Sequence, residues 1–208
     1  MGKKNEHLDT IFFDLFGTLI NIKKSHNFYG LMLSEMGILK NLNEEKEFVL
    51  KHNFDSVEDY FFKRFGRVLN KRLVDEFNCE IESLSLYSGV EDVLTQLKGN
   101  GYKVGIISNL ASPYKVAVEK LGLDKLVDDC IFSCDEGVIK PEFEIYKIAC
   151  DRLNSEPIKC LMVGDSFTSD YVGAERAGMH SIHVDRGFNL GFDYQISKLE
   201  QLIDKFNL

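Results

Sequence analysis

The sequence has no apolar run long enough to cross a membrane, and its basic residues are outnumbered by acidic ones. Its 208 residues include 25 lysines and arginines against 33 aspartates and glutamates, which gives a net charge of −8. Nucleic acids and anionic membrane surfaces repel such a chain, so neither is an expected partner. A small anionic ligand remains compatible with this charge, because a bound metal ion can reverse the field of a site.

The cysteines do not form a recognisable metal-binding or disulfide pattern. There are five of them, and none lies in a Cys-x-x-Cys pair or a Cys/His array with zinc spacing. The first nine residues are polar and lack the apolar segment of a signal peptide. These absences predict a cytoplasmic protein with reduced, mostly buried thiols. No feature of the sequence indicates an oligomeric state.

Proline is also scarce, and none of the three prolines lies between Ile22 and Leu86. This stretch is rich in Lys, Glu, Leu and Phe at helical spacing, with an apolar stripe in its third segment that extends to Val68. The predicted helices are Phe28–Met36, Glu44–Phe54, Val57–Leu69 and Arg72–Leu84. Because the stretch is too long for a loop and has enough apolar residues for a core, it is interpreted as an inserted helical cap.

Strands alternate with helices in the rest of the chain. The predicted strands are the first part of Thr10–Ile20, Tyr102–Ile107, Cys130–Ser133, Cys160–Val163 and Ser181–Val184. The predicted helices are Val90–Lys98, Pro113–Leu121, Glu142–Leu153, Thr168–Ala177 and Ser197–Phe206. This alternation predicts an α/β fold, a doubly wound parallel-sheet (Rossmann-like) core with an inserted α-helical cap. The expected domains are residues 1–20 and 88–208 for the core and 21–87 for the cap.

Polar side chains follow the predicted strands at the points where ligands bind in doubly wound sheets. They are Asp14 and Thr18, then Ser108 and Asn109, then Lys140, and finally Asp165 and Asp170. His180 and His183, which flank the last predicted strand, are expected to pack in the fold or lie at its surface.

These residue types together favour phosphoryl chemistry. Three carboxylates at neighbouring strand ends offer the oxygen ligands that Mg²⁺ prefers. The Ser108 hydroxyl, the Asn109 amide N–H and the Lys140 ammonium are donors suited to the oxygens of a phosphoryl group. Asp14 is then placed to act as a nucleophile and to form an aspartyl-phosphate.

Four segments of the chain resemble the four motifs of the haloacid dehalogenase-like (HAD) hydrolase superfamily, in the family's order. They are Asp14-Leu-Phe-Gly-Thr18, Ser108-Asn109, Lys140-Pro141 and Gly164-Asp165-Ser-Phe-Thr-Ser-Asp170. The insertion after the first motif resembles the helical cap of the subgroup that contains phosphoglycolate phosphatases, phosphonatases and dehalogenases. The resemblance implies a Mg²⁺-dependent hydrolase that acts on a small phosphorylated substrate.

The resemblance also implies a role for each motif residue. Asp14 is the expected nucleophile. The implied metal ligands are Asp14, the backbone carbonyl of Phe16, Asp165 and Asp170, the last of which orients Lys140 or a metal-bound water. The implied phosphate-binding and catalytic residues are Thr18, which orders the turn, Ser108 and the Asn109 backbone, which hold the phosphate, and Lys140, which neutralises its charge.

Phe16 departs from the family pattern. Family phosphatases carry a second aspartate at this position, two residues after the nucleophile, as acid for the leaving alcohol and base for the hydrolytic water. A phenyl ring cannot transfer a proton, and such catalysis is worth about 10²–10⁴-fold. One hypothesis is a phosphatase that prefers activated leaving groups such as acyl or aryl phosphates. Another is that the substrate or a cap residue supplies the proton, with His26 as the first residue to test.

Three alternatives stay open. Dehalogenases of the superfamily carry an aromatic residue at the position of Phe16, but they work without metal and leave Asp165 and Asp170 unexplained. A phosphonatase keeps the metal aspartates and needs a cap lysine. The candidates are Lys23, Lys24, Lys51 and Lys63. A non-catalytic module that binds phosphate or metal is the third alternative, which the retained charged residues disfavour.

Overall fold

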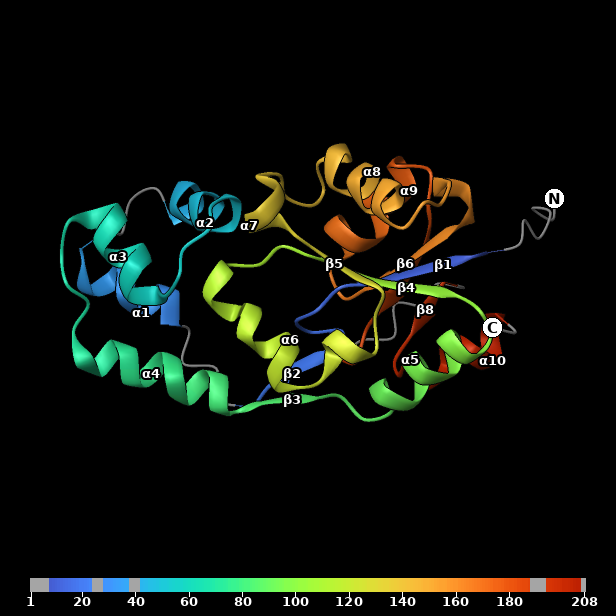
Figure 1. Ribbon diagram of the computed structural model, residues 1–208, viewed down its shortest axis with the longest axis horizontal. Helices are drawn as coiled ribbons and strands as arrows, with labels where there is room; N and C mark the ends of the chain where they lie inside the picture. The colour runs from blue at the N-terminus through green and yellow to red at the C-terminus, as the bar shows by residue number, and fades with distance from the viewer. Residues whose placement is uncertain (1–7, 24–27, 38–41, 188–193, 207–208) are drawn as a thin grey trace.

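The core of the protein is a parallel six-stranded sheet (Figure 1). The computed structural model describes residues 8–23, 28–37, 42–187 and 194–206. In the order in which they pair, the strands are β5 (Asp129–Phe132), β4 (Lys103–Ser108), β1 (Thr10–Phe13), β6 (Cys160–Gly164), β7 (His180–Val184) and β8 (Gln195–Ile196). Every neighbouring pair in this sheet is parallel, which confirms the predicted doubly wound fold. The two-residue strand β8 was not predicted.

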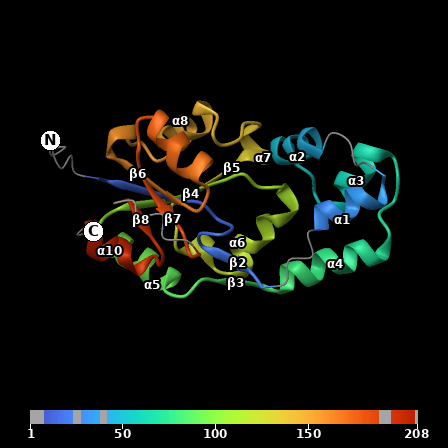
Figure 2. The same ribbon diagram turned by 180° about the vertical axis from the view of Figure 1, so that it is seen from behind.

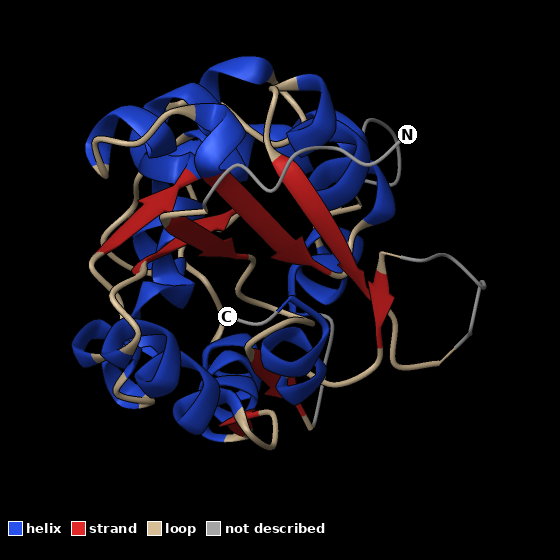
Figure 3. Ribbon diagram, turned by 90° about the vertical axis from the view of Figure 1, so that its right-hand side faces the viewer, coloured by secondary structure: helices blue, strands red, loops and turns tan. Residues whose placement is uncertain are grey.

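Helices cover both faces of the sheet (Figure 3), and the central strand is buried for this reason. Phe12 packs with α8 (Phe143–Arg152) and α9 (Gly173–Arg176) on one face. Its neighbours Ile11 and Phe13 point to the other face, because side chains alternate along a strand. The helices on that face are α5 (Val90–Gly99), α6 (Val116–Lys120) and α10 (Glu200–Phe206).

Four helices lie together at one end of the molecule, away from the sheet (Figures 1 and 2). They are α1 (Phe28–Glu35), α2 (Leu42–Lys51), α3 (Val57–Phe65) and α4 (Lys71–Glu82), and they are called the helical segment below. A short antiparallel ribbon of β2 (Ile20–Ile22) and β3 (Leu84–Leu86) flanks this segment in the chain. The four predicted helices are therefore confirmed, whereas the ribbon was missed and Leu84 was wrongly placed in a helix.

The third predicted helix was too long at its C-terminal end. Helix α3 ends at Phe65 because Gly66 has a φ of 65° and its N–H donates to the carbonyl of Phe62, which closes the last turn. Val68 was predicted to belong to the apolar stripe of this helix, but it lies beyond the helix and is 85% exposed.

Several other helix and strand boundaries differ from the predicted ones because of local backbone geometry. The predicted helix 113–121 begins as a 3₁₀ turn at Ser112–Lys115, and the predicted helix 168–177 begins as a π-helical turn at Phe167–Val172. Ser133 was assigned to a strand but opens the short helix α7 (Ser133–Glu136). Further 3₁₀ turns span Leu123–Lys125 and Pro157–Lys159. In the described part of the chain, no helix has the length and apolar character needed to cross a membrane.

Candidate active site

Three of the predicted site residues meet in a buried ion-paired cluster at the carboxyl edge of the sheet. The Lys140 ammonium lies 2.7 Å from Asp14 Oδ1 and 2.6 Å from Asp170 Oδ1. Its third N–H donates to the carbonyl of Ile107 at 2.7 Å, so all three of its donors are used. All three charged side chains are buried. The two carboxylates compensate the charge of a lysine that burial would otherwise disfavour.

A third carboxylate adjoins this cluster. One oxygen each from Asp14, Asp165 and Asp170 can be chosen so that all three lie within 4.8 Å of one another. When all three are ionised, these groups and the protonated Lys140 carry an excess of two negative charges. A cluster of carboxylate oxygens with this excess charge fits a hard divalent cation such as Mg²⁺, which requires oxygen ligands.

Burial and the charges of neighbouring groups shift the pKa values of the cluster. Burial raises the pKa of Asp14 to about 7, and the charges of Asp170 and Asp165 add to the increase while Lys140 opposes it. Partial burial and the charge of Asp170 raise the pKa of Asp165 as well. Burial lowers the pKa of Lys140, but the charges of Asp14 and Asp170 outweigh it and raise the pKa overall. The lysine therefore stays protonated, and a further cation would favour the ionised carboxylates.

Glycine is required at two positions where the backbone approaches these carboxylates. Gly17 has a φ of 89°, and a Cβ at this position would overlap the Asp165 carboxylate. A Cβ on Gly164 would likewise overlap the carboxylate of Asp170. The Thr18 hydroxyl lies 3.5 Å from Asp165 Oδ1, so the turn after β1 contacts the loop after β6. The close approach of these two loops brings the acidic side chains together.

Asn109 holds the backbone of Lys140 in place. Its side-chain amide donates to the Lys140 carbonyl at 2.8 Å and accepts from the Lys140 N–H at 2.7 Å. Ser108 precedes it at the buried end of β4. The Asn109 side chain thus joins the second and third predicted motifs, whereas only the backbone of this residue was expected to have a role.

Arg186, which follows the last long strand β7, and His183, which lies within that strand, also contact the site loops. Neither was among the predicted site residues. Arg186 donates through Nη2 to the carbonyl of Thr18 at 2.8 Å and through Nη1 to that of Gly17, and its guanidinium lies 3.7 Å from the ring centre of Tyr87. His183, for which a packed or a surface position was expected, is buried, and its Nε2 lies 2.9 Å from the carbonyl of Asp165. No motif marked Arg186, because its role depends on a contact across 168 positions of the chain.

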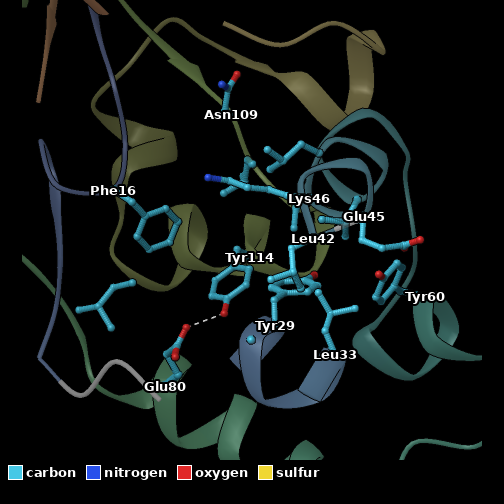
Figure 4. Close-up of a pocket in the computed structure, with 16 residues that line it drawn as sticks. Phe16, Tyr29, Leu33, Leu42, Glu45, Lys46, Tyr60, Glu80, Asn109 and Tyr114 are labelled. Carbon is cyan, nitrogen blue, oxygen red and sulfur yellow. Dashed lines mark hydrogen bonds between the residues drawn. The ribbon is translucent and has the colours of Figure 1, made fainter. Parts of the chain in front are cut away.

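A cavity of about 480 Å³ opens beside the turn after β1, between the helical segment and the core (Figure 4). Phe16 and Asn109 line it from the core side, and residues of all four helices of the helical segment line it from the other. The Phe16 ring packs edge-on against Tyr114, with ring centres 5.7 Å apart. Phe16 therefore forms part of the cavity wall.

Among the lysines considered for a cap-derived imine, the three that the structure describes do not line this cavity. Lys51 pairs with Glu142 at 2.7 Å and with Glu47 at 2.8 Å, and Lys63 pairs with Asp59 at 2.8 Å. The hydrogen bonds that the ammonium groups donate to these carboxylates raise the pKa of both lysines, which opposes the deprotonation that an imine requires. Lys23 is exposed, while Lys24 and His26 lie outside the described residues. A different lysine, Lys46, lines the cavity.

Comparisons with known proteins agree with this doubly wound fold. The chain belongs to the haloacid dehalogenase-like hydrolases, whose family model matches residues 8–178. The predicted superfamily is therefore confirmed, and the chain is a hydrolase.

Individual relatives include both phosphatases and dehalogenases. A glyceraldehyde 3-phosphate phosphatase of Pyrococcus furiosus is 28% identical over 222 aligned positions, which cover 95% of this chain and 92% of the relative. The (S)-2-haloacid dehalogenase 4A of Burkholderia cepacia is 29% identical over 138 positions, which cover 66% of this chain and 59% of the relative. The crystal structure of a HAD phosphatase from Thermococcus onnurineus has a TM-score of 0.69 and 27% identity, and the match covers 95% of this chain and 97% of that one.

Proposed function

We propose that this hydrolase is a Mg²⁺-dependent phosphatase that acts on a small phosphorylated metabolite through an aspartyl-phosphate on Asp14. The observation that carries the proposal is the buried cluster of Asp14, Lys140 and Asp170 with Asp165 beside it. A nucleophilic carboxylate, a fixed ammonium and two further carboxylates are the groups that phosphoryl transfer to an aspartate requires. The phosphatases among the relatives support the same reaction class.

In this proposal, an oxygen of Asp14 attacks the phosphorus, and the ester oxygen leaves with the bonding electron pair. Lys140 remains protonated and neutralises charge on the nucleophile and the phosphoryl group, while Ser108 and the Asn109 backbone hold the phosphoryl oxygens. Water then cleaves the acyl phosphate, which releases inorganic phosphate and restores Asp14. Because Phe16 cannot donate a proton, the leaving oxygen takes its proton from water or the substrate, or departs as a stable anion.

The metal ligands in this proposal are Asp14, the Phe16 carbonyl, Asp165 and Asp170. Mg²⁺ at this position supplies charge neutralisation and orients the phosphoryl group. Among the four residues, Asp14 and Asp170 also bind Lys140, so the cation and the lysine share the same carboxylates. The arrangement is supported by the three carboxylates of the cluster, which outnumber its single ammonium and can therefore also bind a divalent cation.

Residues 21–87 are proposed to act as a cap domain over the core formed by residues 1–20 and 88–208. Direct contacts between the two parts support this assignment. Phe54 and Ser112 exchange hydrogen bonds of 2.7 and 2.9 Å, and Lys51 forms an ion pair with Glu142 on the core side. The cap would then enclose the leaving group while the core holds the phosphate.

The Phe16 ring specifically favours a second candidate, a 2-haloacid dehalogenase, because halide leaves without a proton. The acidic cluster opposes this candidate, since a metal-free dehalogenase has no need of Asp165 and Asp170. Release of chloride from 2-chloropropionate without added metal would support the dehalogenase.

A phosphonatase would instead form an imine between a lysine and the substrate carbonyl. Borohydride trapping of a phosphonate-derived carbonyl compound on Lys46 would support this alternative.

Removal of divalent cations is expected to abolish hydrolysis of 4-nitrophenyl phosphate, and Mg²⁺ is expected to restore it. Asp165→Asn should raise the Mg²⁺ concentration for half-maximal activity by at least about 10-fold, on the scale of losses at metal-site partners. Asp151→Asn is the matched control, because Asp151 forms an exposed ion pair with Lys147 on α8. Full activity in the presence of a chelator would contradict the proposal.

Arg186→Met is expected to lower kcat/KM for the same ester by about 10-fold, because the carbonyls of Gly17 and Thr18 would lose their common donor. Arg186→Lys should recover only part of the activity, since an ammonium cannot reproduce the planar, two-pronged contact. Arg176→Met is the control, as Arg176 is exposed on α9. A kcat/KM for Arg186→Met equal to the wild-type value would show that the turn after β1 does not need the hydrogen bonds from Arg186.

A further inference from the structure

The cavity beside Phe16 is more apolar than a small, polar phosphate ester requires. Aliphatic and aromatic side chains dominate its wall, among them Phe16, Leu33, Val49, Leu50, Leu110 and Tyr114. Its volume of about 480 Å³ falls in the range of pockets that enclose drug-sized ligands, about 300–1,000 Å³. A three-carbon polyol would neither fill this space nor bury its own hydroxyls favourably against such a wall.

Two tyrosines of the wall have buried hydroxyls with unused hydrogen-bonding capacity. Tyr29 on α1 and Tyr60 on α3 contact each other edge-on, with ring centres 5.8 Å apart. Among the residues that the structure describes, neither hydroxyl has a hydrogen-bond partner. Burial raises the pKa of both phenols, so both stay protonated and offer a donor as well as an acceptor. Buried polar atoms are nearly always paired, and a bound ligand would provide the missing partners.

The charged groups of the wall limit what this ligand can be. Glu45 is held by Arg64, whose Nε donates to Oε2 at 2.9 Å, and Glu80 accepts a hydrogen bond from the Tyr114 hydroxyl. Figure 4 shows the Lys46 side chain extended into the cavity. One ammonium can complement a single phosphoryl group, whereas a second anionic group would face Glu45 and Glu80.

We propose that the cavity receives the organic part of a phosphate monoester whose alcohol or phenol is ring-containing and mostly apolar, with a neutral hydroxyl or carbonyl group at the end remote from the phosphate. The phosphoryl group lies at the Asp14 end, and the remote polar group pairs with the hydroxyls of Tyr29 and Tyr60. This inference rests on the proposed phosphatase function and names its substrate class.

Two esters of similar leaving-group acidity test it: 4-(2-hydroxyethyl)phenyl phosphate and 4-ethylphenyl phosphate. In the wild-type protein, kcat/KM is expected to favour the hydroxylated ester by about 3- to 10-fold, the value of one or two hydrogen bonds. The preference should appear mainly in KM and should disappear in the Tyr29→Phe/Tyr60→Phe double variant. Tyr194→Phe is the control, because Tyr194 is 52% exposed and lies outside the cavity. Reading a ratio within each variant cancels changes in general activity.

The melting temperature of the substrate-free double variant separates ligand binding from a structural role. It should not fall, since the substitutions remove hydroxyls that lack partners in the free protein. Equal kcat/KM values for the two esters in the wild-type protein, or a preference that survives in the double variant, would overturn the inference. Hydrolysis of acetyl phosphate, which is too small to need the cavity, tests the phosphatase function separately. Its absence would contradict that function itself.

Discussion

Asp14→Asn is expected to lower kcat for acetyl phosphate and 4-nitrophenyl phosphate by about 10³-fold or more, the scale of loss when a covalent nucleophile is removed. An amide oxygen is a much weaker nucleophile than a carboxylate and cannot form the acyl phosphate. The effect should appear in kcat rather than in KM, because Ser108, Asn109 and Lys140 remain available to bind the phosphoryl group. Measurement needs only steady-state kinetics at saturating Mg²⁺.

Two observations separate this chemical loss from unfolding. Lys140 keeps Asp170 as a partner in the variant, at 2.6 Å in the present structure, so the buried ammonium is not left without a counter-charge. Circular dichroism and a cooperative thermal transition should therefore persist. In the wild-type protein, acid quenching during turnover should trap a phosphoryl group on the peptide that contains Asp14. Phosphorylation of another residue, or activity retained in Asp14→Asn, would refute the nucleophile assignment.

The approach of Asp14, Lys140 and Asp170 could be predicted from the sequence because parallel strands end at one edge of a doubly wound sheet. Each of these residues follows a recognisable apolar strand or a Gly/Pro turn, so local patterns were sufficient. Their convergence follows from the topology, whereas their pairing was implied by the family resemblance. The same topology predicts that the carboxylates of Asp14, Asp165 and Asp170 lie together, in an arrangement that suits a metal ion.

Other features depend on contacts that no local pattern encodes. Arg186 acts on Thr18 through a loop, and the ribbon strands Ile20–Ile22 and Leu84–Leu86 are too short for a period-two pattern to be visible. The cavity arises where four helices meet the core, so which aromatic residues face it depends on packing angles. Tyr60 lies in the third predicted helix and is buried, and it also lines the cavity. These departures from prediction thus arise where distant segments meet.

Phe16→Asp is expected to raise kcat for an alkyl phosphate such as glycerol 3-phosphate by about 10²-fold or more, within the range that general acid–base catalysis provides. The new carboxyl would occupy the position of the acid/base aspartate of family phosphatases, two residues after Asp14. An alkoxide is a poor leaving group and gains most from a donated proton. Acetyl phosphate, whose acetate leaves readily without a proton, should gain little.

The substitution has a structural cost that must be measured beside the gain. It removes a half-buried ring that packs against Tyr114, and loss of this contact should lower the free energy of unfolding by about 1–3 kcal/mol. Phe16→Asn is the matched control, because it removes the same ring and adds polarity but cannot transfer a proton. A gain that appears in both variants would therefore reflect access to the site and not acid catalysis.

A plot of log kcat against leaving-group pKa distinguishes the mechanisms across a series of aryl and alkyl phosphates. If no group in the wild-type site protonates the leaving oxygen, the plot should be steep, with activated esters strongly preferred. In Phe16→Asp it should flatten, because a protonated leaving group carries little charge whatever its acidity. A flat plot for the wild-type protein would mean that another group already donates the proton, and Lys46, which extends into the cavity beside Phe16, would be the residue to substitute next.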